Sequence, residues 1–153
     1  MGSLYGASHS ELFVGDRETE DGARAEMSRF KVLHFATHGV LDGKDPLYSH
    51  ILLSQSGSTE EGLLEAQEIM ALNLTADIAI LSACDTARGR ISSGEDVMGM
   101  TRALFVAGCP RTVVSQWSVK SQSTTKLMIE FHRALLARKK QSDRNAAAGP
   151  SVS

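Results

Sequence analysis

The chain has 153 residues, of which 42% are hydrophobic and 22% are charged, and its formal net charge is −2 at pH 7. This balance predicts one soluble globular domain with a single core, and it excludes the strongly basic composition of many nucleic-acid-binding proteins. No apolar run reaches the roughly 18 residues of a membrane span, and the N-terminus lacks the basic start and apolar stretch of a signal peptide. We therefore expect a cytoplasmic protein that binds neither nucleic acid nor membrane.

The cysteines and histidines show no metal-ligand pattern. Cys84 and Cys109 are too few for a disulfide framework and too far apart for a metal knuckle, so we expect reduced thiols. His34 could form a metal pair with His38 on one strand face, but packing of His34 against a helix is the favoured interpretation. Three other histidines have no ligand spacing: His9, His50 and His132. Glycine-rich nucleotide motifs are missing as well, and we expect neither a metal nor a cofactor.

The first two thirds of the chain alternate between short apolar runs and one helical pattern. Residues 30–39, "FKVLHFATHG", predict a buried strand that Gly39 closes, and residues 50–54 predict a second strand. Residues 63–73 are typical of a helix that stops at Asn73. Residues 76–84, "ADIAILSAC", have apolar side chains on both phases, as in a strand covered on both faces.

The last third continues the alternation. A helix is expected to begin at Ser93, as an N-cap followed by acids, and to end at Gly108. Residues 109–117 predict a third buried strand, and residues 121–140 predict a long amphipathic helix. The polar, Ala/Gly/Ser-rich residues 141–153 predict a disordered tail.

Strands that alternate with helices favour an α/β fold with a mostly parallel sheet. Reactive groups collect at the carboxyl ends of the strands in such sheets, and His38 and Cys84 both end apolar runs. Six residues are expected in the core: Leu33, Phe35, Ile78, Ile80, Val113 and Val114.

His38 and Cys84 have the chemistry of a catalytic dyad. An imidazole beside a thiol can take its proton and leave the nucleophilic thiolate. Gly39 allows close backbone approach, and the N–H groups of Gly39 and Cys84 could form an oxyanion hole. On the pattern alone, a buried cysteine and a core histidine that never meet is the more common outcome.

Three segments resemble the CHAT family, which is related to caspases, separase and gingipains. They are "VLHFATHG", "GLLEAQEIMALNLTADIAILSACDTARG" and "GEDVMGMTRALFVAGCPRTVVSQWSV", in this order, and the resemblance runs from Phe30 to Leu136. It implies a caspase-like three-layer αβα sandwich with a mostly parallel sheet. It also implies that His38 and Cys84 form the catalytic dyad, with Gly39 beside the oxyanion hole.

The resemblance extends to substrate binding and regulation. It implies that Ser115, Gln116 and Trp117 line a groove that accepts the peptide substrate as an added strand. Related sequences often have an acid where Lys120 stands here, so we expect a neutral or acidic P1 residue if Lys120 faces the pocket, and no effect if it faces solvent. We also expect a helical-repeat protein or segment to gate the site, since CHAT domains are often joined to one.

The resemblance divides the chain into a partial N-terminal segment (1–29), a catalytic region (30–140) and the tail (141–153). Family members are usually longer at both ends, so we expect a fragment or a divergent domain. We expect the fold to be truncated at its N-terminal side. Three functions are open: a cysteine endopeptidase, an inactive interaction module with the same groove, and an unrelated α/β binding domain with incidental Cys and His.

Overall fold

The computed structural model describes residues 2–6, 10–15, 19–40, 42, 45–55, 62–82, 84–85, 96–115 and 121–147. For a few of these, including Cys84 and Asp85, the description covers the backbone alone. The chain divides into two compact units, residues 13–118 and residues 1–12 together with 119–153. Each unit is described by itself below.

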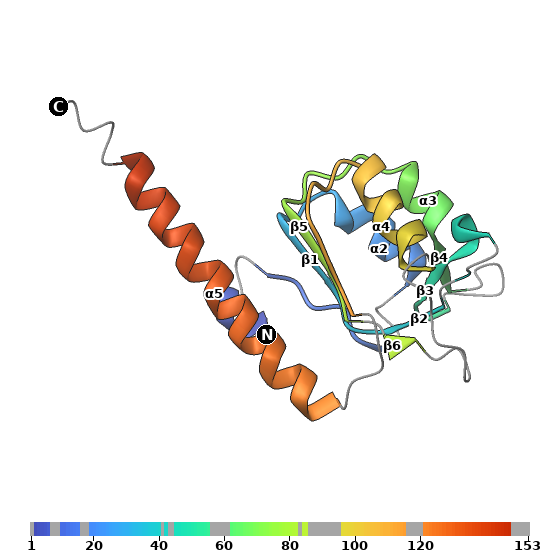
Figure 1. Cartoon of the computed structure of the whole chain (residues 1–153), viewed down its shortest axis with the longest axis horizontal. Helices are drawn as coiled ribbons and strands as arrows, with labels where there is room; N and C mark the ends of the chain where they lie inside the picture. The colour runs from blue at the N-terminus through green and yellow to red at the C-terminus, as the bar shows by residue number, and fades with distance from the viewer. Residues whose placement is uncertain are drawn as a thin grey trace. The chain divides into compact units, whose positions relative to one another are not determined.

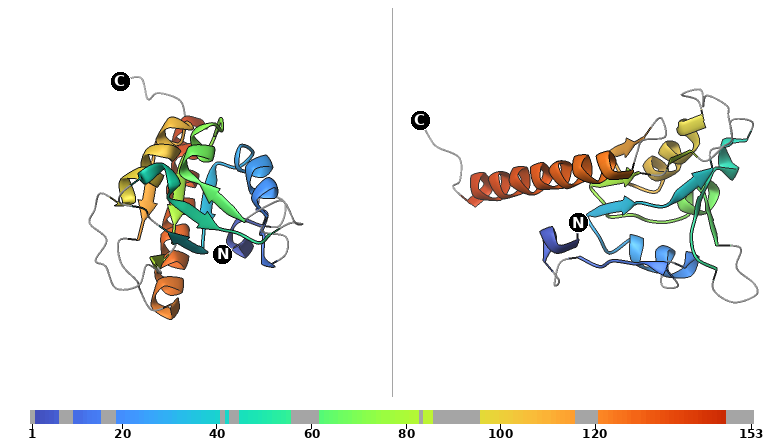
Figure 2. Two further views of the ribbon diagram at one scale, coloured as in Figure 1. Left: turned by 90° about the vertical axis from the view of Figure 1, so that its right-hand side faces the viewer. Right: turned by 90° about the horizontal axis from the view of Figure 1, so that it is seen from below.

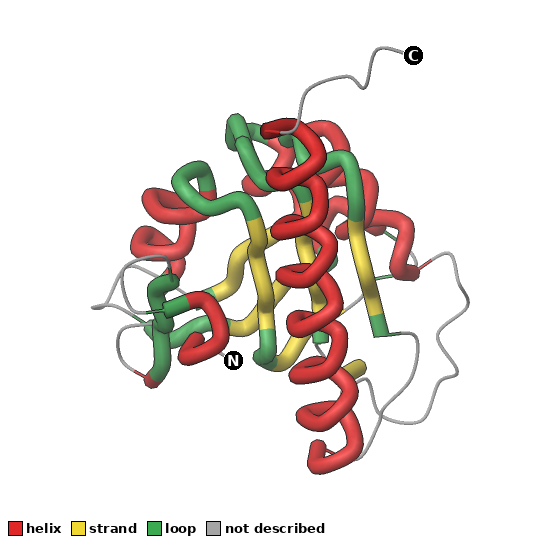
Figure 3. Tube along the Cα trace, turned by 90° about the vertical axis from the view of Figure 1, so that its left-hand side faces the viewer, coloured by secondary structure: helices red, strands yellow, loops and turns green. Residues whose placement is uncertain are grey.

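A three-stranded parallel sheet forms the centre of the 13–118 unit. Its strands are β1 (Val32–Phe35), β5 (Ile78–Leu81) and β7 (Thr112–Val114), in the order β1-β5-β7. Both pairings are parallel, and the strands run side by side in Figure 3. The prediction of an α/β fold with a parallel sheet is therefore confirmed.

A second sheet has the order β4-β3-β2-β6. It consists of β2 (His38–Val40), β3 (His50–Leu52), β4 (Leu63–Glu65) and β6 (Cys84–Asp85). The pairs β2–β3 and β3–β4 are antiparallel, whereas β2 and β6 are parallel. The two strands expected over 30–39 and 76–84 are thus each divided between the two sheets.

The predicted helix over 63–73 is wrong in its extent. Leu63–Glu65 is strand β4, because it pairs with β3, and only Ala66–Met70 is helical (α3). The helix begins with a capping box in which Glu68 accepts a hydrogen bond from the backbone N–H of Glu65, at 2.9 Å. The guanidinium of Arg24 binds the carboxylates of Glu20 and Glu68, which links α2 (Glu20–Met27) to α3.

Helix α4 (Asp96–Val106) ends as the sequence predicts, whereas the predicted N-cap Ser93 lies outside the described residues. Gly108 has a φ of +106°, a conformation that favours glycine, and a Cβ there would meet the Leu74 carbonyl oxygen at 2.9 Å. At Gly99 a Cβ would meet the Pro46 carbonyl oxygen at 2.3 Å. This close approach lets the short helix η2 (Pro46–Tyr48) lie against α4, with α3 beside both (Figure 2).

The core lies between the first sheet and helices α2, α3 and α4, which are on the same side of it in Figure 1. Leu33, Ala79 and Leu81 point into this core cluster, and residues that alternate with them, such as His34 and Ile80, are on the other face. Of the six predicted core residues, two are buried and four are half-buried. Leu33 and Ile80 are buried; Phe35, Ile78, Val113 and Val114 are half-buried.

The other unit contains α1 (Gly2–Tyr5) and the long helix α5 (Ser121–Ala147). The helix continues past Lys140, so residues 141–147, predicted to belong to a disordered tail, are helical instead. The hydroxyl of Tyr5 and Nδ1 of His132 are hydrogen-bonded at 2.7 Å, and their rings meet edge to face. Within the described residues, no helix is long and apolar enough to cross a membrane.

His132 should make this unit less stable in acid. Its side chain is only 2% exposed, and burial lowers the pKa of the imidazole below its usual 6.5. Below about pH 6.5 the unfolded chain binds a proton that the folded chain does not, so the free energy of unfolding falls as the pH falls from about 6.5 towards the folded-state value. Urea unfolding between pH 5 and 7.5 should show this loss for the wild type and a weaker one for His132→Phe. The same pH dependence in both proteins would contradict the prediction.

Candidate active site

The backbone places His38 directly opposite Cys84. The two residues are register partners in the parallel pair β2–β6, and Gly39 is the partner of Asp85. Adjacent strands are about 4.8 Å apart, and register partners in parallel strands have side chains on the same face. The site that the sequence predicted from two separate motifs is therefore brought together at the level of the backbone.

The register of this pair continues that of the first sheet. Val32 pairs with Ile78 in β1–β5, and His38 pairs with Cys84 in β2–β6; both pairs are separated by 46 positions in the sequence. Two residues separate β1 from β2, and two residues separate β5 from β6. The register is therefore the same in both ladders. The ladder of the first sheet, with four residue pairs, thus has the same register as the pair of His38 and Cys84.

His38 is exposed, whereas the Gly39 that follows it is buried. Strand β2 is held from the other side by β3, and the hydroxyl of Thr37 donates a hydrogen bond to the Leu52 carbonyl oxygen at 2.6 Å. The histidine is therefore accessible on a strand that is fixed on both edges. The part of Gly39 and of the Cys84 N–H in an oxyanion hole stays a prediction.

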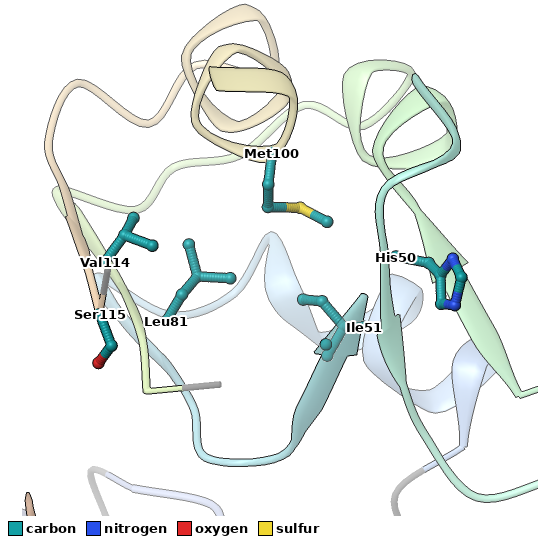
Figure 4. A pocket seen from close by; sticks show the side chains of 7 residues that line it. His50, Ile51, Leu81, Met100, Val114 and Ser115 are labelled. Atoms are coloured by element: carbon teal, nitrogen blue, oxygen red, sulfur yellow. The ribbon is translucent and has the colours of Figure 1, made fainter. Parts of the chain in front are cut away.

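A small cavity of about 20 Å³, room for roughly one water molecule, lies next to this site. The side chains of Ile51, Leu81, Met100 and Val114 point into it, whereas the ring of His50 lies on the far side of β3 (Figure 4). Its other lining residues are Gly39 and Ser115. Most of the described lining residues are apolar, and none of them has a carboxylate.

Ser115 is the one predicted substrate-binding residue that the structure describes. It is half-buried, lies just after β7, and its backbone N–H donates to the Leu81 carbonyl oxygen at 3.1 Å. That bond places Ser115 beside the C-terminal end of β5, near the residues that follow this strand. Gln116, Trp117 and Lys120 lie outside the described residues, as does the side chain of Cys84.

The thiol of the second cysteine, Cys109, has the features of an unreactive one. Cys109 is fully buried, its thiol donates to the Arg111 carbonyl oxygen at 3.3 Å, and burial raises the pKa of the thiol. A raised pKa reduces the thiolate fraction at neutral pH, and burial blocks access to reagents. Cys109 is thus a small side chain of the core.

His34 lies in strand β1, and its packing against a helix stays a prediction. Its Nε2 is hydrogen-bonded to Oγ of Ser82 at 2.7 Å, a contact between residues 48 positions apart that the sequence analysis missed. His50 uses Nδ1 to donate to the Tyr48 carbonyl oxygen at 2.9 Å. Among the residues whose side chains are described, no group of three His, Cys, Asp or Glu could hold a metal ion.

Comparison with known families gives a match over nearly the whole chain. The model of the CHAT domain matches residues 1–148, which include both halves of the candidate dyad. A search of curated proteins finds no match.

The register can be tested by a disulfide. A cysteine at position 38 should form an intramolecular bond with Cys84 under mild oxidation, because opposed residues on adjacent strands lie within the Cα separation that a disulfide tolerates. Gly39→Cys is the matched control, since its side chain would point to the other face of the sheet. Mass spectrometry without reductant should find the cross-link in His38→Cys and little of it in Gly39→Cys. Equal yields in the two variants would contradict the pairing.

Proposed function

Because the chain belongs to the CHAT domain family, which is related to caspase-like peptidases, we propose that it is a cysteine endopeptidase. Cys84 is the nucleophile, and His38 is the general base and acid. The observation that carries the proposal is the parallel register in which His38 faces Cys84. A nucleophile and its base must lie within hydrogen-bond reach of each other, and this register is the backbone arrangement that allows it.

The reaction needs only groups of the chain and one water molecule. His38 takes the thiol proton, and the Cys84 sulfur attacks the carbonyl carbon of the scissile peptide bond. Backbone N–H groups of Gly39 and Cys84 stabilise the oxyanion that forms. The intermediate collapses as the C–N bond breaks, and the imidazolium gives its proton to the departing amine. Water, deprotonated by His38, then releases the acid product and the free thiol.

The proposal extends to how a peptide binds. Strand β7 is at an edge of the first sheet in the described residues, and an exposed strand edge can accept an extended peptide as a further strand. Ser115, which follows β7, would contact the substrate together with Gln116 and Trp117. The partner is thus a protein or peptide segment in extended conformation.

We further propose that the protein works in the cytosol and is gated by a partner. A helical-repeat protein or segment would supply activation and part of the specificity. The purified chain by itself should then show weak proteolysis, and its thiol reactivity is the more direct measure of the dyad.

Thiol labelling tests the dyad. At pH 7.5 iodoacetamide should alkylate Cys84 at least about tenfold faster than Cys109, because Cys109 is buried and its thiol has a raised pKa. His38→Ala should remove most of this advantage, whereas His50→Ala, which removes the histidine whose ring lies away from the cavity, should not. The rates are measured by mass spectrometry of the two tryptic peptides.

Equal slow labelling of the two cysteines in the wild type would contradict the proposed nucleophile. Fast labelling of Cys84 without cleavage of any peptide, even with candidate partners added, would favour the inactive interaction module over the peptidase.

Charge at position 120 should influence which bond is cut. In this proposal Lys120 faces the P1 pocket and repels an arginine or lysine there, and the cavity lined by Gly39 and Ser115 has no carboxylate among its described lining residues. We expect hydrolysis of P1-varied peptides to favour neutral or acidic P1 residues, and Lys120→Asp to shift the preference towards basic ones. Lys126→Asp, in α5, makes the same change of charge and serves as the control. A wild-type preference for P1 arginine or lysine would refute the charge argument.

A further inference from the structure

A hydrogen bond between two side chains lies just before both candidate catalytic residues. The Nε2 atom of His34 and the Oγ atom of Ser82 are 2.7 Å apart, and both side chains are half-buried. His34 is four residues before His38, and Ser82 is two residues before Cys84. The bond therefore bridges the two chain segments that lead to the dyad.

The register explains why these two side chains meet. His34 is paired with Ile80, and Ser82 is two residues further along, so it is the diagonal neighbour of His34 on the same face. Diagonal neighbours are within reach when one side chain is long. Leu33 and Leu81, which alternate with this pair, point into the core cluster. The His34–Ser82 bond thus lies on the sheet face that is turned away from that cluster.

Ser82 is bound to β1 twice. Its backbone N–H donates to the Phe35 carbonyl oxygen at 2.8 Å, and its hydroxyl is bonded to His34. One hydrogen bond would fix the distance between Ser82 and β1. The second bond also fixes how the Ser82 backbone is rotated about the strand axis. Residues 36 and 37 and Ser82 itself belong to neither ladder, yet the register is the same before and after them.

We propose that His34 and Ser82 are positioning residues for the dyad, an inference that rests on the proposed function. Their hydrogen bond holds the ends of β1 and β5 so that β2 and β6 resume with His38 facing Cys84. A slip of one residue would turn the Cys84 side chain to the opposite face of the sheet. Neither residue takes part in the chemistry; both act through the backbone that carries it.

The test removes the bond with Ser82→Ala and keeps it with Ser82→Thr, which retains a hydroxyl. Ser82→Ala should slow the alkylation of Cys84 by iodoacetamide about tenfold or more, since a misplacement near 1 Å can cost about a hundredfold in rate. It should also speed the amide hydrogen exchange of residues 38–40. Ser82→Thr should restore both quantities.

Two measurements separate positioning from general stability. Thr75→Ala also removes one side-chain hydrogen bond, from Thr75 Oγ1 to the Ser28 carbonyl oxygen, but away from the dyad, and it should change neither readout. Alkylation of the buried Cys109 reports opening of the core, and it should stay slow in Ser82→Ala. In a double-mutant cycle with His34→Phe, the effects of the two substitutions should be non-additive, because either one breaks the same bond.

Three results would overturn the inference. The first is wild-type Cys84 reactivity and wild-type exchange of residues 38–40 in Ser82→Ala. The second is faster alkylation of Cys109 in parallel with the loss at Cys84, which would mean that the whole core has loosened. The third is labelling of Ser82 by a fluorophosphonate, which would make the serine a nucleophile. If the wild-type Cys84 is itself unreactive, the proposed function fails, but hydrogen exchange in Ser82→Ala still tests the positioning.

Discussion

The parallel pairing of β1 with β5 is the constraint on which the rest of the 13–118 unit depends. It joins residues 46 positions apart and sets the register that β2 and β6 inherit. The intervening chain must return to the same edge, and it does so through β3, β4 and α3, which build the second sheet and part of the core. Strand β7 then adds to β5 on its other side. Both the core and the candidate site therefore depend on the β1–β5 pairing.

The sequence predicted the first sheet because its strands are apolar runs bounded by turn residues. It also predicted the end of α4, since Gly108 adopts a conformation that few other residues accept. It missed the second sheet because strands of two or three residues are too short for a period to show. Leu63–Glu65 precedes strong helix formers, and only its pairing with β3 makes it a strand. Such tertiary pairing overrides local propensity.

The candidate dyad could be found from sequence because His-Gly and Ala-Cys each end an apolar run. The His34–Ser82 bond could not, since a histidine and a serine 48 positions apart form no motif. Once Ile80 is known to face His34, however, Ser82 follows as the diagonal neighbour. The missing information was the register, which is a property of the assembled sheet. A short-range pattern identifies reactive residue types, and the long-range pairing decides which other side chains support them.

The β2–β6 ladder is too short to fix its own geometry. It has two residue pairs, and an isolated pair of strands is marginal even when longer. Its alignment must come from its neighbours: the β1–β5 ladder before it, β3 beside β2, and the bonds from Thr37 and Ser82 that tie the connecting residues. This arrangement leaves His38 exposed to solvent, while the apolar core supplies the rigidity. The geometry of the candidate site thus depends on residues that lie outside it.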